Sequence, residues 1–230
     1  FSTPFELEAF ANQIWLFGSN PEVGSLLLKS SDGATWDPVA TPAWETSAGG
    51  LETVSTPDRL VVLGSLAGGT GTYVWSTTDG SSWTQSSAVI PGTSPYGFDV
   101  TFANGALWVT GETDIALYQS TDWGDSWAPV STNLPELDSL VGVDLMNLGT
   151  SPGLILSFGI NMTSGSSTYI SENGSEWTKV ADEDFDGVTI SDSGQIWLYE
   201  GGDSYTNVPS ELYTIGGPLR NGRFFYYQKD

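Results

Sequence analysis

A short segment that ends in tryptophan occurs four times in this chain, and we call each copy a box. The copies read SSDGATW at 30–36, TTDGSSW at 77–83, STDWGDSW at 120–127 and SENGSEW at 171–177. Their final tryptophans follow one another at intervals of 47, 44 and 50 residues. A repeat of that length predicts an array of one supersecondary unit, because an irregular core has no reason to return to the same turn at a steady interval.

Apolar runs between turn residues accompany each box. In the third repeat they predict strands at 98–103, 107–110, 116–120 and 126–130. Four antiparallel strands in about 40–50 residues are the size of one β-propeller blade. The sequence therefore predicts an all-β fold, a single β-propeller domain over residues 1–230. It would have five blades of four antiparallel strands, at about 5–39, 50–87, 96–131, 138–180 and 186–228. The fifth blade lacks a box, and the alternative is that the chain forms part of a larger propeller.

The residue types of a box suit a tight corner between two antiparallel strands. A Ser or Thr hydroxyl and an Asp or Asn side chain accept hydrogen bonds from the backbone N–H groups that follow them. Glycine supplies the positive φ of a tight reversal, and the tryptophan covers an apolar edge. We therefore expect a structural role for Ser30, Asp32, Gly33 and Trp36; Thr77, Asp79, Gly80 and Trp83; Ser120, Asp122, Gly124 and Trp127; and Ser171, Asn173, Gly174 and Trp177.

These boxes resemble the Asp-box, a repeat of bacterial neuraminidases with the pattern Ser-x-Asp-x-Gly-x-Thr-Trp. The third box is similar to it at Ser120, Asp122, Gly124, Ser126 and Trp127, and the other three follow a shorter variant. Over about residues 5–200 the chain is thus similar to the Asp-box (BNR/sialidase-type repeat) β-propeller family. That resemblance implies that the boxes lie at the corner between the third and fourth strands of a blade, on its periphery and away from the ligand face.

The composition of the chain excludes several classes of partner and site. It has 28 acidic and 6 basic residues and a formal net charge of −22, so it would repel nucleic acid and anionic membrane surfaces. It contains no cysteine and no histidine, which excludes thiolate metal sites and a Ser-His-Asp triad. No apolar run approaches the ~18 residues of a membrane-spanning helix. We expect a secreted or cell-surface location, reached after removal of a signal peptide.

Sialidases are the best-known proteins with Asp-boxes, and the resemblance implies three arginines that hold the substrate carboxylate. The chain offers Arg59, Arg220 and Arg223. The last two are close in sequence, and Arg59 is expected in a turn on the side of the boxes. We therefore predict a non-catalytic member of the family. A glycoside hydrolase of a propeller family is the alternative, because such enzymes need only two carboxylates and no spacing in the sequence singles out a pair.

The loops at the end of the blades opposite the boxes are the predicted ligand face, because loops carry function more often than framework residues do. Aromatic rings beside carboxylates suit the CH faces and hydroxyls of sugars, and equally a protein surface. The sequence thus favours a recognition or adhesion module that binds a glycan or a protein surface. A structural subunit that binds copies of itself is a further alternative. The candidate ligand-binding residues are Trp44, Tyr96, Glu112, Asp114, Asp203 and Tyr205.

One acidic loop has the composition of a calcium site. Asp182, Asp184 and Asp186 alternate before Gly187, an arrangement in which carboxylates can surround a hard cation. The glutamate that would complete a calcium-binding loop is missing, so a solvated acidic loop is the alternative. No other cofactor is expected.

Overall fold

The computed structural model describes residues 6–20, 24–40, 44–45, 52–66, 71–90, 99–110, 117–134, 140–147, 154–160, 167–181, 187–190, 196–200, 211–215 and 226–227. This part of the chain consists of strands and turns without a helix, and it therefore holds no helix that could span a membrane. The chain divides into two compact units, Phe1–Pro129 and Val130–Asp230, and each has its own sheets.

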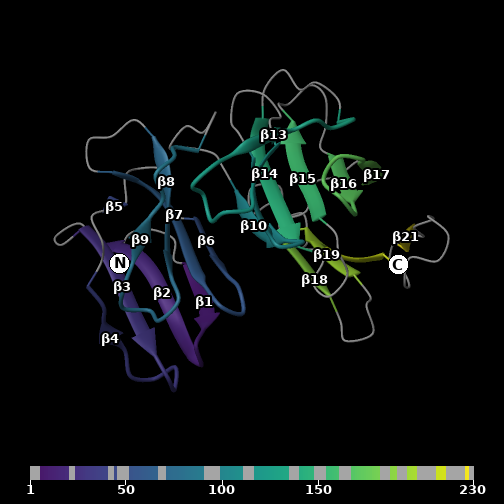
Figure 1. The fold of residues 1–230 in the computed structure, drawn as a ribbon. Helices are drawn as coiled ribbons and strands as arrows, with labels where there is room; N and C mark the ends of the chain where they lie inside the picture. The colour runs from purple at the N-terminus through teal and green to yellow at the C-terminus, as the bar shows by residue number, and fades with distance from the viewer. Residues whose placement is uncertain are drawn as a thin grey trace. The chain divides into compact units, whose positions relative to one another are not determined.

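Antiparallel sheets whose strands follow chain order make up the first unit (Figure 1). The first sheet contains β1 (Glu6–Phe10), β2 (Gln13–Asn20), β3 (Gly24–Ser30) and β4 (Asp37–Pro38). The third has the same order in β10 (Val100–Ala103), β11 (Ala106–Thr110), β12 (Leu117–Ser120) and β13 (Ala128–Val130). Strands that are neighbours in sequence are therefore neighbours in the sheet, as expected for short connections.

The second sheet contains an additional strand. Its main strands are β6 (Glu52–Ser55), β7 (Leu60–Leu66), β8 (Thr72–Thr77) and β9 (Thr84–Gln85). In addition, β5 (Trp44–Glu45) pairs with the far end of β7, with Trp44 opposite Leu66. We expected Trp44 in a loop. The structure has a two-residue strand there because β7 extends beyond β6, and its remaining backbone groups pair with β5.

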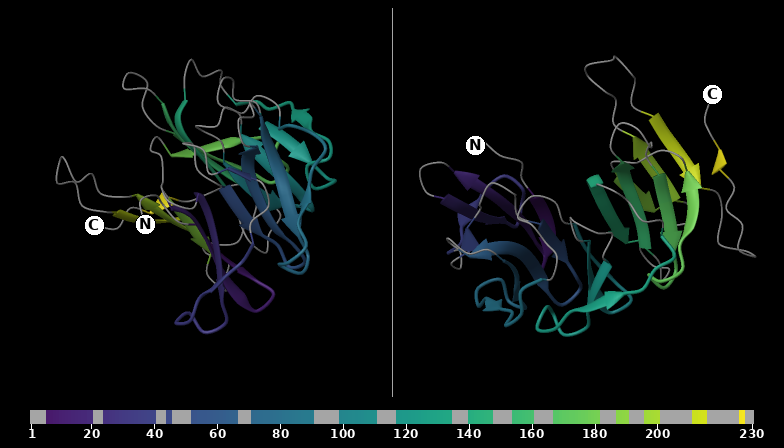
Figure 2. Two further views of the ribbon diagram at one scale, coloured as in Figure 1. Left: turned by 90° about the vertical axis from the view of Figure 1, so that its left-hand side faces the viewer. Right: turned by 90° about the horizontal axis from the view of Figure 1, so that it is seen from above.

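The second unit repeats this strand order in two sheets among its described residues. One sheet contains β14 (Leu140–Asn147), β15 (Leu154–Ile160), β16 (Ser167–Ser171) and β17 (Thr178–Ala181). The other contains β18 (Gly187–Ile190), β19 (Ile196–Glu200), β20 (Glu211–Ile215) and β21 (Tyr226–Tyr227). In Figure 2 these sheets are the green and the yellow-green strands.

The boxes fix a common register in four sheets. The first hydroxyl residue of each box is paired across the sheet with an apolar residue near the start of the second main strand. The pairs are Ser30 with Ile14, Thr77 with Leu60, Ser120 with Leu107 and Ser171 with Leu154. This shared pairing defines equivalent positions, so that a residue in one sheet can be compared with its counterparts in the others.

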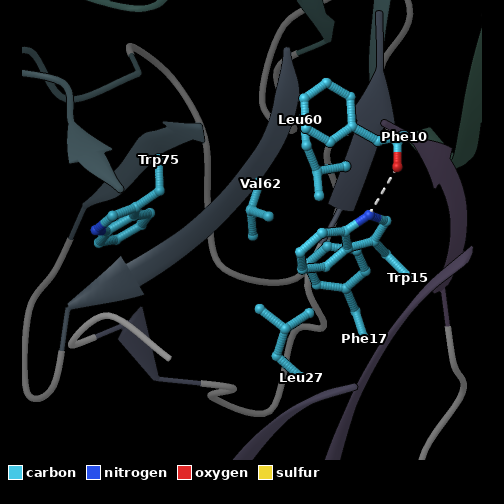
Figure 3. Packing of buried hydrophobic residues seen from close by; sticks show 7 residues of the cluster. All are labelled: Phe10, Trp15, Phe17, Leu27, Leu60, Val62 and Trp75. Carbon is cyan, nitrogen blue, oxygen red and sulfur yellow. Dashed lines mark hydrogen bonds between the residues drawn. The ribbon is translucent and has the colours of Figure 1, made fainter. Parts of the chain in front are cut away.

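The core of the first unit lies between its sheets. One face of the first sheet packs against the second sheet through Phe10, Trp15, Phe17, Leu27, Leu60, Val62 and Trp75 (Figure 3). The opposite face of the second sheet packs against the third through Val61, Leu63, Val74, Val100, Leu107 and Val109. The second sheet is thus buried on both faces, because side chains alternate between the two faces along each strand.

The first sheet has one face that no described sheet of its unit covers. On it Ile14 is 38% exposed, whereas its counterparts Leu60 and Leu107 are 0% and 1% exposed. Leu7 is 62% exposed on the same face, while Val100, its counterpart in the third sheet, is 6% exposed. In this unit, the equivalent face is therefore buried where another sheet precedes it in the chain.

Candidate functional site

Each box is closed by hydrogen bonds from its own backbone. In the first box the Gly33 N–H donates to Ser30 Oγ at 2.8 Å. The N–H groups of Ala34 and Thr35 donate to Asp32 Oδ1, both at 2.8 Å. The second and fourth boxes repeat these bonds. Because these N–H groups find acceptors inside the turn, the corner is stabilised by its own atoms and presents few free donors to a ligand.

The same hydrogen bonds change the acidity of the box carboxylates. Backbone N–H groups, led by that of Thr35, lower the pKa of Asp32. Those led by the N–H of Ser82 lower the pKa of Asp79. A hydrogen bond donated to a carboxylate stabilises its charged form. Both groups are exposed and ionised at neutral pH. In the first and second boxes the backbone N–H groups of the turn are therefore bonded to a carboxylate anion.

Two of the boxes are seated on the sheet that precedes their own. A Cβ atom on Gly80 of the second box would lie 2.5 Å from the ring of Trp15 in β2. One on Gly124 of the third box would lie 2.6 Å from the side chain of Val74 in β8. Gly33 of the first box is exposed, and a Cβ there would come no closer than 3.8 Å to a side chain of its own sheet. Only glycine allows the close approach of the second and third boxes.

Hydrogen bonds also connect a box to an earlier part of the chain, and we call each such contact, by packing or by hydrogen bond, a joint. The N–H of Ser87, which follows β9, donates to Asp125 Oδ1 of the third box at 3.0 Å. In the second unit Asn133, between β13 and β14, accepts a bond from the Trp177 N–H at 2.7 Å and donates one to the Trp177 carbonyl at 3.1 Å. The second, third and fourth boxes are therefore joints to an earlier part of the chain as well as corners.

The third box is one residue longer than the others, and the extra residue is Trp123. Its φ is 61°, in the left-handed region. The insertion moves the glycine one place along, so that Gly124 donates its N–H to Ser120 Oγ at 2.8 Å. The hydroxyl of Ser126 donates to Asp122 Oδ2 at 2.6 Å and is the main cause of the lowered pKa of Asp122. The longer box thus keeps the anionic acceptor of the shorter ones.

Away from the box end of the sheets, an acidic residue occupies one register position in the first main strand or directly before it. In the second main strand, one residue pairs with the box hydroxyl residue, and the residue three places further along that strand pairs with the acidic residue. In the first unit β6 lies beside both β1 and β10, which places three of these residues on neighbouring strands. The set consists of Glu6, Glu52, Asp99 and Asp144.

Sequence reasoning missed this acidic set, although a signal for it exists. Glu6, Glu52 and Asp99 each lie eight residues before the apolar residue that pairs with the box hydroxyl. A chain with 28 acidic residues hides such a spacing until the strand register aligns the repeats. The register therefore supplies what inspection of the composition could not.

Two carboxyl groups share the joint between the first and second sheets. Glu8 accepts hydrogen bonds from Ser55 Oγ at 2.6 Å and from Thr53 Oγ1 at 3.1 Å. Glu6 lies two residues earlier on the same face of β1 and is half-buried, and its burial, together with the nearby charge of Glu8, raises its pKa. The joint thus places a carboxyl group whose pKa is raised beside one that accepts two hydroxyl hydrogen bonds.

The structure describes one of the residues predicted to bind a ligand. Trp44 begins β5, at the same end of the second sheet as Glu52. The other candidates, Tyr96, Glu112, Asp114, Asp203 and Tyr205, lie outside the described residues, as do the calcium candidates Asp182, Asp184 and Asp186. Within the described ranges no three acidic residues come close enough together to hold a metal ion.

Comparison with known proteins connects this strand pattern to a fold. A family model, the DUF6242 beta propeller domain, matches residues 30–187. No curated protein sequence matches the chain. The fungal lectin from Aleuria aurantia, a six-bladed β-propeller, shares 11% identity at a TM-score of 0.59, and the match covers 97% of this chain and 77% of the lectin.

Two further solved structures are similar. A variant of AofleA from Arthrobotrys oligospora shares 12% identity at a TM-score of 0.61, over 99% of this chain and 73% of that one. The GH74 enzyme from Niastella koreensis shares 18% identity at a TM-score of 0.65, over 97% of this chain and 38% of the enzyme. Together with the family model, these likenesses show an all-β, β-propeller fold.

Proposed function

The chain belongs to the DUF6242 β-propeller domain family, and from that premise we propose that it is a non-enzymatic, extracellular recognition module that binds a glycan. In this proposal each of the five described sheets is one blade of a five-bladed propeller, and the boxes are Asp-boxes. The ligand face is the end of the sheets opposite the boxes.

The observation that carries this proposal is the acidic residue repeated at one register position. Glu6 and Glu52 lie in the first main strands of the first and second sheets, and Asp99 directly precedes β10 of the third. Carboxylate oxygens accept hydrogen bonds from the adjacent hydroxyl groups of a sugar. The backbone of Trp44 lies at the same end of the second sheet, and tryptophan is a residue type that suits the CH face of a sugar. We propose that Tyr96, Glu112, Asp114, Asp203 and Tyr205 complete this face.

Two further points favour this end over the other. The backbone donors of the boxes are occupied within their own turns, so the box end offers few groups to a neutral sugar. The propeller lectin from Aleuria aurantia recognises fucose, which shows that a chain of similar fold can serve as a sugar receptor. Its low identity leaves the choice of sugar for this chain to experiment.

A glycan array followed by calorimetric titration of the best ligand tests the proposal. The double variant Glu52→Gln, Asp99→Asn is expected to weaken binding at least tenfold, because it removes two anionic acceptors. Glu176→Gln is the matched control, since Glu176 is an exposed residue of the fourth box, and it should leave the affinity unchanged. Failure to bind any glycan, or equal losses in both variants, would contradict the proposal. Self-association through this face would instead favour a structural subunit.

A glycoside hydrolase is the second candidate, because Glu6 and Glu8 form a carboxyl pair with unequal environments. The Glu6 pKa is raised, and Glu8 accepts hydrogen bonds from two hydroxyls. Glycoside hydrolases use two carboxyl groups in unlike environments. Incubation with nitrophenyl glycosides distinguishes the candidates. Release of nitrophenol that is lost in Glu6→Gln but retained in Glu176→Gln would establish an enzyme. No release together with glycan binding supports the recognition module.

A further inference from the structure

The third box contains an insertion whose backbone is unfavourable. Trp123 has a left-handed backbone with φ 61°, which a side chain other than glycine seldom adopts. The other three boxes close without this extra residue, through the bonds from Gly33, Gly80 and Gly174. The insertion therefore requires another explanation.

Trp123 positions an arginine of the second sheet. Its ring stacks on Phe102 with centroids 5.3 Å apart and planes inclined by 6°. The Cζ atom of Arg59 lies 4.6 Å from the centroid of the Trp123 ring. A guanidinium group over an indole face is attracted by the ring quadrupole. This stack joins the turn between β6 and β7 to the third box.

The backbone and side chain of Arg59 are fixed by further hydrogen bonds. The Arg59 N–H donates to Thr56 Oγ1 at 2.9 Å, and the Thr56 N–H donates to the Arg59 carbonyl at 2.7 Å. Arg59 Nη1 donates to Ser76 Oγ at 3.0 Å. The guanidinium is therefore held in place before any ligand arrives, which reduces the entropy lost on binding.

Arg59 forms no ion pair with a carboxylate in the described part of the chain, where its side chain contacts Ser76 and Trp123. Asp58 precedes Arg59 in the same turn, and its Oδ1 atom accepts a hydrogen bond from the Thr56 hydroxyl at 3.0 Å. A guanidinium has five N–H donors in a planar fork that matches a carboxylate. One of these donors is bonded to Ser76, which leaves others for a ligand.

We propose that Arg59, supported by Trp123, forms a binding site for a carboxylate at the box end of the first unit. The ligand is either a sugar acid or an acidic amino-acid side chain, since both present the same group. The site is independent of the proposed glycan face, which uses the opposite end of the sheets. This site would also explain the insertion in the third box, because the inserted Trp123 positions the guanidinium of Arg59.

Titration of the isotopically labelled protein with sodium glucuronate, glucose and N-acetyl-glutamate amide tests this site by NMR. Glucose is the uncharged control for glucuronate. We expect either carboxylate to shift the Arg59 Nε–H and Trp123 indole signals, and glucose to leave them unchanged. The carboxylate that binds more tightly identifies the source of the group.

Variants separate a binding site from a purely structural stack. Arg59→Gln should weaken carboxylate binding at least tenfold, and Arg59→Lys should weaken it severalfold because the planar fork is lost. The matched control is Lys29→Gln, since Lys29 Nζ lies 5.9 Å from the Trp15 ring centroid in a comparable stack; it should bind like the parent. Unchanged signals on addition of both carboxylates, in a protein whose circular dichroism shows it to be folded, would overturn the proposal. Equal binding by Arg59→Gln would do the same.

Discussion

At the scale of single residues, Gly33 and Gly80 show that the same position in a box can require glycine for two separate reasons, the backbone conformation and the close packing of a neighbour. They are equivalent in the first and second boxes, and their φ angles are 73° and 72°. A side chain at either position would therefore meet the same backbone strain. Only Gly80 is buried, with the ring of Trp15 in the space that a Cβ would need. The pair separates the cost of the turn from that of the joint to the preceding sheet.

Gly80→Ala is expected to destabilise the protein more than Gly33→Ala. Both substitutions should cost about 1–2 kcal/mol because of the positive φ. Gly80→Ala should cost a further ~1–3 kcal/mol because a Cβ at 2.5 Å forces Trp15 to move. Urea unfolding of the two variants measures the difference. Equal losses of stability would show that the Trp15 side chain can move aside to accommodate a Cβ atom at position 80.

Asp79 makes the stability of its box depend on pH. Backbone N–H bonds from Ser82 and then Ser81 lower its pKa, so the folded value lies below the unfolded value of about 3.9. Such a carboxylate contributes its stability above the unfolded pKa and loses it as the pH falls through the folded pKa. Asp79→Asn reproduces the residue of the fourth box, Asn173, and removes this titration.

The stability of Asp79→Asn should therefore fall less steeply than that of the parent as the pH drops below about 4. Thermal unfolding at a series of pH values measures both slopes. Parallel curves for the two proteins would mean that the hydrogen bonds to Asp79 do not couple folding to protonation.

At the scale of strands and sheets, burial depends on which sheets have a predecessor. Leu107→Ala should cost ~2–4 kcal/mol, because it leaves a cavity between the second and third sheets. Ile14→Ala at the equivalent position should cost less than ~1 kcal/mol, since Ile14 is 38% exposed and leaves little cavity. Chemical denaturation tests the pair. A large loss for Ile14→Ala would show that this face is covered in solution.

The sheets were predictable from the sequence because each box fixes both a turn and a strand register. The strands predicted in the third repeat correspond to β10, β11, β12 and β13. Which face of each sheet packs against a neighbour was harder to predict from the sequence. The turns between the first two main strands differ in length, with residues 56–59 between β6 and β7 but only 11–12 between β1 and β2, so the repeats do not align by residue count. Alternating residues in a strand do not by themselves reveal which face they occupy, and the strand pairing is needed to assign them. For the same reason the acidic set at the far end of the sheets was missed.

At the scale of the whole molecule, the net charge of −22 opposes folding by self-repulsion. Salt screens such repulsion within a Debye length of about 10 Å at 0.1 M. The melting temperature should therefore rise as NaCl increases from about 0.02 to 0.5 M. Differential scanning calorimetry measures this shift. A fall in melting temperature would show that attractive ion pairs outweigh the repulsion.

Calcium chloride at matched ionic strength extends this test to the acidic loop. If Asp182, Asp184 and Asp186 bind calcium, CaCl2 should raise the melting temperature beyond the effect of NaCl, because a ligand that binds the folded state stabilises it. The extra rise should disappear in Asp184→Asn. Equal effects of the two salts on the parent would leave the loop as a solvated acidic segment.

Among the described residues, the contacts that the second, third and fourth boxes make with another sheet or turn are with earlier parts of the chain. Gly80 rests on Trp15, Gly124 on Val74, and Trp177 is bonded to Asn133. During translation, therefore, the seat of each of these boxes leaves the ribosome before the box itself. A newly made corner finds its support already synthesised, so that folding can follow the order of synthesis from the N-terminus without waiting for later repeats.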